Sequence, residues 1–136
     1  MGKKPPQNPT CQSLLICDGI HRDQGTGKYY ILGTFRDIGT RQLPARVPLM
    51  CVFVVLTDGM GPTPICVKLV YVGSEEHEQE LATASGEIVF EDPRMVAELA
   101  LPLGSIQFDH FGEYRVQLFA ADDLLLESRL LVIEIK

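Results

Sequence analysis

The feature that most constrains the fold is the run Leu49–Leu56, in which every side chain is apolar. A strand with one face in water alternates apolar and polar residues, so a strand without alternation has both faces covered. The cover is either a segment of the same chain, for which Gly39–Val47 and the acidic stretch Gly73–Gln79 are candidates, or a second subunit. The stretches Leu124–Leu126 and Leu130–Ile133 raise the same requirement near the C-terminus. We therefore expect a homo-oligomer, associating through an apolar strand surface.

Short runs of β-branched and aromatic residues, separated by turn residues, predict an all-β chain. The alternation of Met95, Ala97, Leu99 and Leu101 favours a strand over a short helix capped by Asp92. The predicted strands cover residues 12–18, 28–38, 49–57, 65–72, 86–91, 95–101, 113–121 and 124–135. No repeat or change of composition divides the chain, so we expect a flexible tail over residues 1–10 and a single domain over 11–136.

Composition excludes several classes of protein. Of the 136 residues 46% are hydrophobic, which is ordinary for a folded domain. The net charge of −6 argues against a nucleic-acid partner, because such proteins present a basic face to phosphates. No apolar run reaches the length of a membrane span, and no apolar region follows the N-terminal lysines as in a secretory signal. We expect a cytoplasmic protein with no membrane partner.

Four cysteines, Cys11, Cys17, Cys51 and Cys66, lie far apart and form no C-x-x-C pair. Structural zinc sites usually take their ligands in close pairs, so a zinc site is not expected. Cys17, Cys51 and Cys66 lie among Leu, Ile and Val, where a reduced cysteine acts as a small apolar residue. We expect four free thiols in a reducing compartment, and one disulfide is the alternative.

The segment Leu101–Val116, with Gly112-Glu113-Tyr114 near its end, resembles the entry to the penultimate strand of immunoglobulin-like domains. The resemblance implies that Tyr114 is a tyrosine corner, with its ring in the core and its hydroxyl bonded to upstream backbone. Val116 stands where an antibody domain has its second cysteine, and the chain has no tryptophan. We therefore expect an immunoglobulin-like antiparallel β-sandwich of about seven or eight strands without the disulfide.

The N-terminal half carries Leu-Ile-Cys-Asp at 15–18, Thr-Gly-Lys-Tyr at 26–29 and Ile-Leu-Gly-Thr-Phe at 31–35. This order resembles the opening of an uncharacterised family of small bacterial single-domain proteins. The resemblance implies a fold and no functional residues. Within it, Gly33 indicates a β-bulge or a close backbone approach.

Motifs that would carry chemistry are incomplete. Gly25-Thr26-Gly27-Lys28 lacks the first glycine and the final Ser or Thr of a phosphate loop, which has Arg22 and Tyr29 in those places here. The tripeptide His21-Arg22-Asp23 matches a kinase catalytic loop, but the remaining kinase motifs are absent. The sequence predicts no catalytic residues, no metal site and no cofactor.

The most varied polar cluster surrounds the first predicted loop and the end of the second predicted strand. Its members are Asp18, His21, Arg22, Asp23, Arg36 and Asp37. If they converge on one concave pocket, they indicate a small-ligand-binding protein or an enzyme; if they spread into solvent, they do not. We favour a non-enzymatic binding or assembly module, with the ligand-binding protein or enzyme as the alternative.

Overall fold

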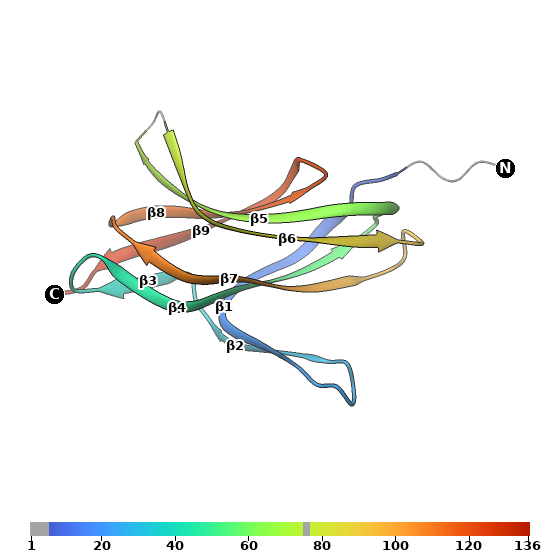
Figure 1. Ribbon diagram of the computed structural model, residues 1–136, viewed down its shortest axis with the longest axis horizontal. Helices are drawn as coiled ribbons and strands as arrows, with labels where there is room; N and C mark the ends of the chain where they lie inside the picture. Colours follow the sequence, from blue (N-terminus) through green and yellow to red (C-terminus); the bar gives the residue numbers. More distant parts are fainter. Residues whose placement is uncertain (1–5, 75–76) are drawn as a thin grey trace.

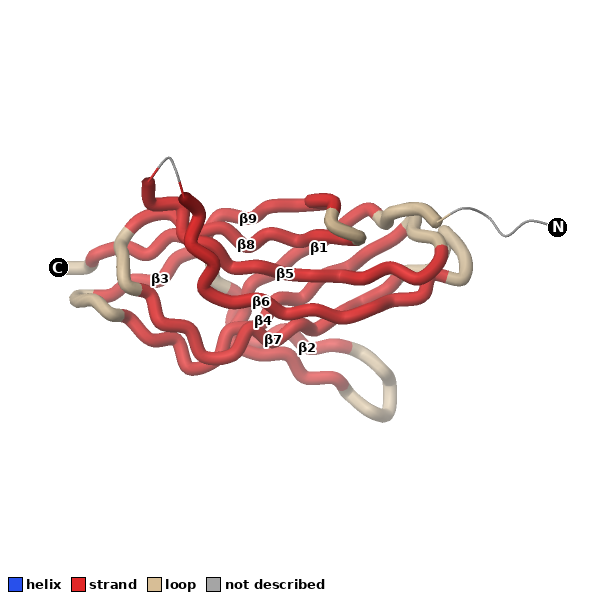
Figure 2. The backbone as a smooth tube through the Cα atoms, turned by 45° about the horizontal axis from the view of Figure 1, so that its top comes forward, coloured by secondary structure: helices blue, strands red, loops and turns tan. Residues whose placement is uncertain are grey.

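The computed structural model describes residues 6–74 and 77–136, and this part of the chain forms nine strands in two stacked sheets (Figures 1 and 2). The strands are β1 (Thr10–Arg22), β2 (Tyr29–Thr34), β3 (Asp37–Thr40), β4 (Ala45–Thr57), β5 (Gly61–Ser74), β6 (His77–Phe90), β7 (Ala97–Phe108), β8 (Gly112–Ala120) and β9 (Asp123–Glu134). One sheet has the order β2-β1-β4-β7, and the other has the order β3-β9-β8-β5-β6. All neighbours are antiparallel except β3 and β9, which are parallel.

The predicted β-sandwich is confirmed, with nine strands in place of seven or eight. Its core lies between the sheets, because alternate residues of the central strands point inward. On β8, Tyr114, Val116, Leu118 and Ala120 are at most 1% exposed, as their alternation predicted. The strand interpretation of the region after Asp92 is also confirmed, since β7 buries Ala97 and Leu101. Within residues 6–74 and 77–136 there is no helix with the length and hydropathy of a membrane crossing.

The single strand predicted over residues 28–38 is wrong, because the chain changes sheets within it. β2 pairs with β1 in the four-stranded sheet, and β3 pairs with β9 in the five-stranded sheet. The backbone crosses at Phe35 and Arg36: the Phe35 amide donates to the Ile16 carbonyl at 3.1 Å, and the Leu131 amide donates to the Arg36 carbonyl at 3.2 Å. Apolar alternation continues through such a crossing, so the pattern does not reveal it.

Several other strands are longer than predicted. β1 continues to Arg22, so that His21 and Arg22 belong to a strand and not to a loop. β5 and β6 form a long hairpin that replaces most of the predicted acidic connection, and its residues 75 and 76 lie outside the described residues. The predicted boundaries follow runs of apolar residues. The additional residues of these strands include many polar side chains that face solvent, so the runs end before the strands do.

Residues 50–54 of β4 are covered on both faces within one chain, whereas Leu49 is 47% exposed. Met50, Val52, Val54 and Leu56 point into the core and are 0% exposed. On the opposite face, Phe53 is only 6% exposed and Cys51 only 7%. The hairpin formed by β1 and β2 projects beneath this face in Figure 1, and the Tyr29 ring lies 5.2 Å from the Phe53 ring. The cover is therefore this hairpin, and neither the Gly39–Val47 segment nor the acidic stretch was the correct candidate.

Tyr114 has the contacts that the immunoglobulin-like resemblance implies. Its hydroxyl donates to the His110 carbonyl at 2.8 Å and accepts from the His110 amide at 3.2 Å. The Phe108 ring meets it edge-on at 4.9 Å, and burial raises the pKa of its hydroxyl. Gly112, at φ 119°, turns the chain back into β8 at an angle that side-chain-bearing residues rarely adopt.

All four cysteines are free, as predicted. The β1–β4 register places Cys17 opposite Cys51, yet the Cys17 thiol donates to the Cys51 carbonyl at 3.6 Å and forms no disulfide. Burial raises the pKa of Cys11, Cys17 and Cys51, and the neighbouring Cys51 raises that of Cys17 further.

Replacing Tyr114 tests the tyrosine corner. Tyr114→Phe removes both hydrogen bonds to His110 and should lower the free energy of unfolding by about 1 kcal/mol. Tyr114→Ala also leaves a cavity and should lower it by roughly 3–5 kcal/mol. Denaturant unfolding measures both, and Tyr30→Phe, at an exposed ring, is the matched control. A Tyr114→Ala protein as stable as the parent would rule out the corner.

Thiol titration tests the cysteine environment. The denatured, unreduced protein should show four reactive thiols. In the folded protein, Cys66 should react with a disulfide reagent well before Cys17 and Cys51, which are buried and hold less thiolate. Two thiols on denaturation would mean that a disulfide exists in solution.

Candidate functional site

The β1–β2 hairpin carries four of the six polar candidates and points them in different directions. The register sets His21 opposite Tyr30 and Arg22 opposite Tyr29, and neighbouring residues on a strand face opposite ways. The Arg22 guanidinium lies over the Tyr29 ring, 5.2 Å from its centroid, on the side that faces β4. The His21 and Tyr30 rings are 6.1 Å apart on the other side. His21 and Arg22 therefore do not share a site.

Asp23 holds the hairpin turn. Its carboxylate accepts from the Gly25 amide at 2.9 Å and from the Thr26 hydroxyl at 3.0 Å, while its own carbonyl accepts from the Gly27 amide at 2.7 Å. The Gly25 bond and then the Thr26 bond stabilise the charged carboxylate, which lowers the pKa of Asp23. At neutral pH the charged carboxylate therefore stabilises the hairpin turn.

Asp18 and Asp37 border one shallow hollow of about 260 Å³, together with Phe35, Ile38 and Val47. The hollow lies where β2 leaves β1. Gly33, at φ 66°, allows this close approach, since a Cβ there would overlap the Asp18 carboxylate. Gly33 and Thr34 complete its lining, and no basic residue of the described chain stands among these residues to pair with the two carboxylates.

Arg36 borders a separate notch between β1 and β9. The notch has a volume of about 310 Å³ and is lined by Leu14, Leu15, Ile16, Thr34, Phe35, Arg36 and Ser128. The structure thus divides the six predicted residues among several surfaces. Among the described residues, no group of three His, Cys, Asp or Glu side chains is arranged to hold a metal ion.

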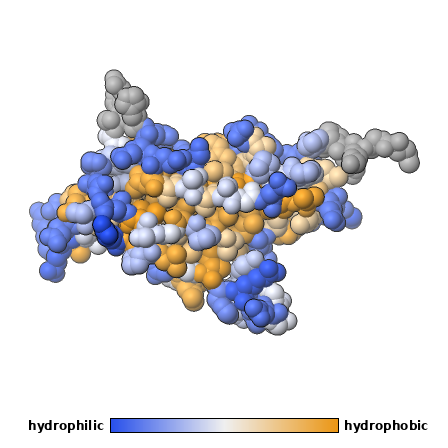
Figure 3. All heavy atoms as spheres, in the orientation of Figure 1, coloured by the Kyte–Doolittle hydropathy of each residue, from blue (hydrophilic) through white to orange (hydrophobic). Residues whose placement is uncertain are grey.

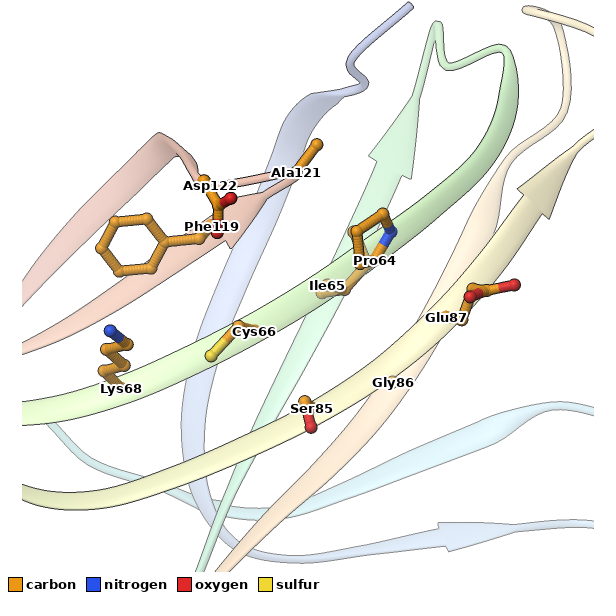
Figure 4. Close-up of a pocket in the computed structure, with 10 residues that line it drawn as sticks. All are labelled: Pro64, Ile65, Cys66, Lys68, Ser85, Gly86, Glu87, Phe119, Ala121 and Asp122. Carbon is orange, nitrogen blue, oxygen red and sulfur yellow. The ribbon is translucent and has the colours of Figure 1, made fainter. Parts of the chain in front are cut away.

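A broad hollow of about 630 Å³ lies on the outer face of the five-stranded sheet, where β5, β6 and the β8–β9 turn meet (Figure 4). It is lined by Pro64, Ile65, Cys66, Lys68, Ser85, Gly86, Glu87, Phe119, Ala121 and Asp122. The Lys68 ammonium lies over the Phe119 ring, 5.2 Å from its centroid, and Glu87 points away from Lys68. Small-ligand sites need several polar groups aimed at one point, and these described lining residues do not supply them.

Exposed apolar side chains form more distinct surfaces than the polar ones. Figure 3 shows apolar residues across the middle of one face, over β6 and β7, with hydrophilic residues around them. At the β6–β7 turn, Val89, Met95 and Val96 are 51%, 37% and 57% exposed. Four further exposed apolar residues lie along β9 and at the residue after it: Leu124, Leu126, Ile133 and Ile135.

β9 is also incompletely paired. Its residues 131–134 lie beside β3, but in the described chain residues 123–130 have β8 as their only strand neighbour. We call residues 123–130 the free edge. A free edge presents unpaired backbone N–H and C=O groups to solvent. The sequence indicates the apolar character of the last strand but not this edge, because no sequence signal records how far β3 extends.

Comparisons with known proteins give a family and no function. A family model described as "Family of unknown function (DUF6941)" matches residues 12–133. Comparison with curated proteins gives no match. Among solved structures, a β-D-glucoside glucohydrolase from Trichoderma reesei is similar to 93% of this chain, at 12% identity and a TM-score of 0.47. The chain spans 19% of the length of that protein, and at this similarity its activity carries no argument.

Replacing Tyr29 tests how the outer face of β4 is covered. Tyr29→Ala removes a half-buried ring from Phe53 and should lower the free energy of unfolding by about 1–2 kcal/mol. Tyr30→Ala, the neighbouring ring at 49% exposure, should change it by less than about 0.5 kcal/mol. Equal effects in chemical denaturation would show that the hairpin does not cover β4 in solution.

Proposed function

We propose that this chain, which belongs to the family of unknown function DUF6941, is a non-enzymatic assembly module that binds a second copy of itself through β9. The observation that carries the proposal is that β9 combines two properties. It has exposed apolar side chains, and its free edge lacks a second strand. Either property alone is common, but together they match how extended segments add to sheets.

The burial of β4 restricts which apolar strand surface can bind a second copy. The run Leu49–Leu56 motivated an oligomer, but the β1–β2 hairpin covers its outer face within one chain. The requirement for a second subunit therefore falls on the last strand, whose apolar stretches are not covered in the same way.

The alternative function, a ligand-binding protein or enzyme built on the polar cluster, has weaker support. Asp23 is engaged in its own turn, Arg22 lies over Tyr29, and His21 faces the other way. Catalytic groups must act on a common point, and these side chains do not share one. The cytoplasm is the compartment that we propose, because four free thiols suit a reducing environment.

Measurement of mass against concentration tests the proposal. Light scattering or sedimentation from about 1 to 100 μM should show a dimer that dissociates on dilution. Leu126→Lys puts a charge on the free edge and should give a monomer at every concentration. Leu32→Lys and Val96→Lys place the same charge at more exposed apolar positions, on β2 and beside β7, and should leave the dimer intact.

Circular dichroism must show that each variant keeps its β-sheet signal and its melting transition. A parent protein with a constant monomer mass would overturn the assembly proposal. Loss of the dimer in Leu32→Lys or Val96→Lys, but not in Leu126→Lys, would move the interface to another strand.

A further inference from the structure

We infer that two copies pair antiparallel through residues 123–129 of β9, about a two-fold axis that passes Leu126. The inference rests on the proposed function, since it specifies the register of that self-association. It joins the two five-stranded sheets into one continuous sheet. The partner is a second copy of this chain, and the length, direction and charge of the free edge favour this register.

Two structural features limit the free edge. At its C-terminal side, β3 lies beside Leu131–Glu134, and the Leu131 amide donates to the Arg36 carbonyl. At its N-terminal side, the β8–β9 turn reverses the chain, with positive φ at Ala121 and Asp122. Between these limits Asn8 Nδ2 donates to the Asp123 carboxylate at 2.5 Å, and the backbone of the free edge has no other strand beside it in the described chain.

Backbone direction restricts where the two-fold axis can lie. The Leu131 amide points away from β8, toward β3, and alternate residues of a strand point the same way. Glu127 and Arg129 therefore direct their N–H and C=O groups outward, whereas Leu126 and Ser128 direct theirs toward β8. Outward groups of one copy must meet outward groups of the other, so the axis passes a residue and not the space between two residues.

Three positions of the two-fold axis are near the middle of the free edge: Leu126, Glu127 and Ser128. Steric overlap excludes the axis at Ser128. With the axis at Ser128, Leu131–Glu134 of one copy would lie beside residues 122–125 of the other. β3 already occupies that place. Axes at Leu126 and at Glu127 avoid most of this collision. With the axis at Leu126, β3 of each copy lies beyond the other copy's free edge, and with the axis at Glu127 it lies at the end of that edge.

Charge then decides between the two remaining axes. An axis at Glu127 would set this carboxylate against the same carboxylate of the other copy, which is destabilising for directly opposed residues. An axis at Leu126 sets Leu126 against Leu126 and brings Arg129 opposite the acidic turn Asp122-Asp123. The bulge of β9 opposite Leu118 and Phe119 shifts this pairing by at most one residue, and both residues of the turn are acidic.

The charged residues are disposed for this register. Glu127 accepts from Arg115 Nη1 and from Gln117 Nε2, both at 2.8 Å, so its carboxylate is held in place on its own sheet. Arg129 is 68% exposed along its side chain and lies 3.7 Å from the Glu113 carboxylate. An acidic group of another copy would therefore compete with Glu113 for this exposed guanidinium.

The notch beside the free edge extends the contact to the second sheet. Leu14 and Leu15 of β1 line it with Ser128 of β9, so a strand placed against β9 would also cover apolar atoms of β1. Stable dimers bury roughly 1,000 Å² or more in total, and a pair of edge strands alone buries less. The notch adds contact with β1, and most of its lining surface is polar.

Disulfide trapping at the axis tests the register. In a Cys11→Ser, Cys66→Ser background, Leu126→Cys places two thiols at a non-hydrogen-bonded pair with Cα atoms about 4.5 Å apart. That separation falls within the range for a disulfide. Oxidation with oxidised glutathione should convert most of this protein to a covalent dimer. The reaction exchanges disulfide for disulfide and releases two molecules of reduced glutathione.

Leu124→Cys in the same background is the matched control. Leu124 is more exposed than Leu126, at 50% against 38%, so random collision would favour its cross-linking. In the inferred register its two copies are about 13 Å apart along the strands, beyond the reach of a disulfide. Leu126→Cys should give at least about tenfold more covalent dimer. A higher yield from Leu124→Cys, or from Glu127→Cys, would overturn the register.

A charge exchange provides a second test that needs no new thiol. Arg129→Glu should weaken the dimer by about tenfold, because it opposes two acidic groups at two equivalent places. Adding Asp123→Arg should restore most of the affinity. No recovery in a folded double variant would also overturn the register. If the parent dimerises and both tests fail, the proposed self-association is retained and the register at Leu126 is wrong. If the parent never dimerises, both proposals are wrong.

Discussion

The packing of both faces of β4 is the constraint on which the rest of the structure depends. Its inward residues, including Met50 and Val54, form the centre of the core with 0% exposure, and its outward residues need a cover as well. The β1–β2 hairpin supplies that cover by bending beneath the sheet, so that Tyr29 meets Phe53. A flat four-stranded sheet would leave this apolar face in water.

The bend of this hairpin determines which strand edges stay open. Because β2 pairs only with Cys17–Arg22, the N-terminal half of β1 has β4 as its neighbour in the described sheet. The chain then crosses to the other sheet and forms the short β3, which accompanies β9 for four residue pairs. The notch and the free edge of β9 are therefore consequences of how β4 is covered.

This geometry also explains why the polar cluster makes a poor active site. Asp23 shapes the hairpin turn, and Arg22 lies over the ring that covers Phe53. Asp18 lies against Gly33 where the two strands separate. These polar residues stabilise the bend of the hairpin, whereas the free edge of β9 presents strand backbone and exposed leucine side chains.

The sequence by itself determined the all-β class, the two-sided burial of β4 over residues 50–54 and the role of Tyr114. These properties depend on local periodicity and on a short motif, which residue order records directly. Only the tertiary structure decided that the chain changes sheets at Phe35 and Arg36, and that Tyr29 covers Phe53. It also decided that β3 ends before the free edge and that the polar candidates separate. Strand pairing joins residues distant in the chain, and the same alternation fits several partners until the whole fold selects one.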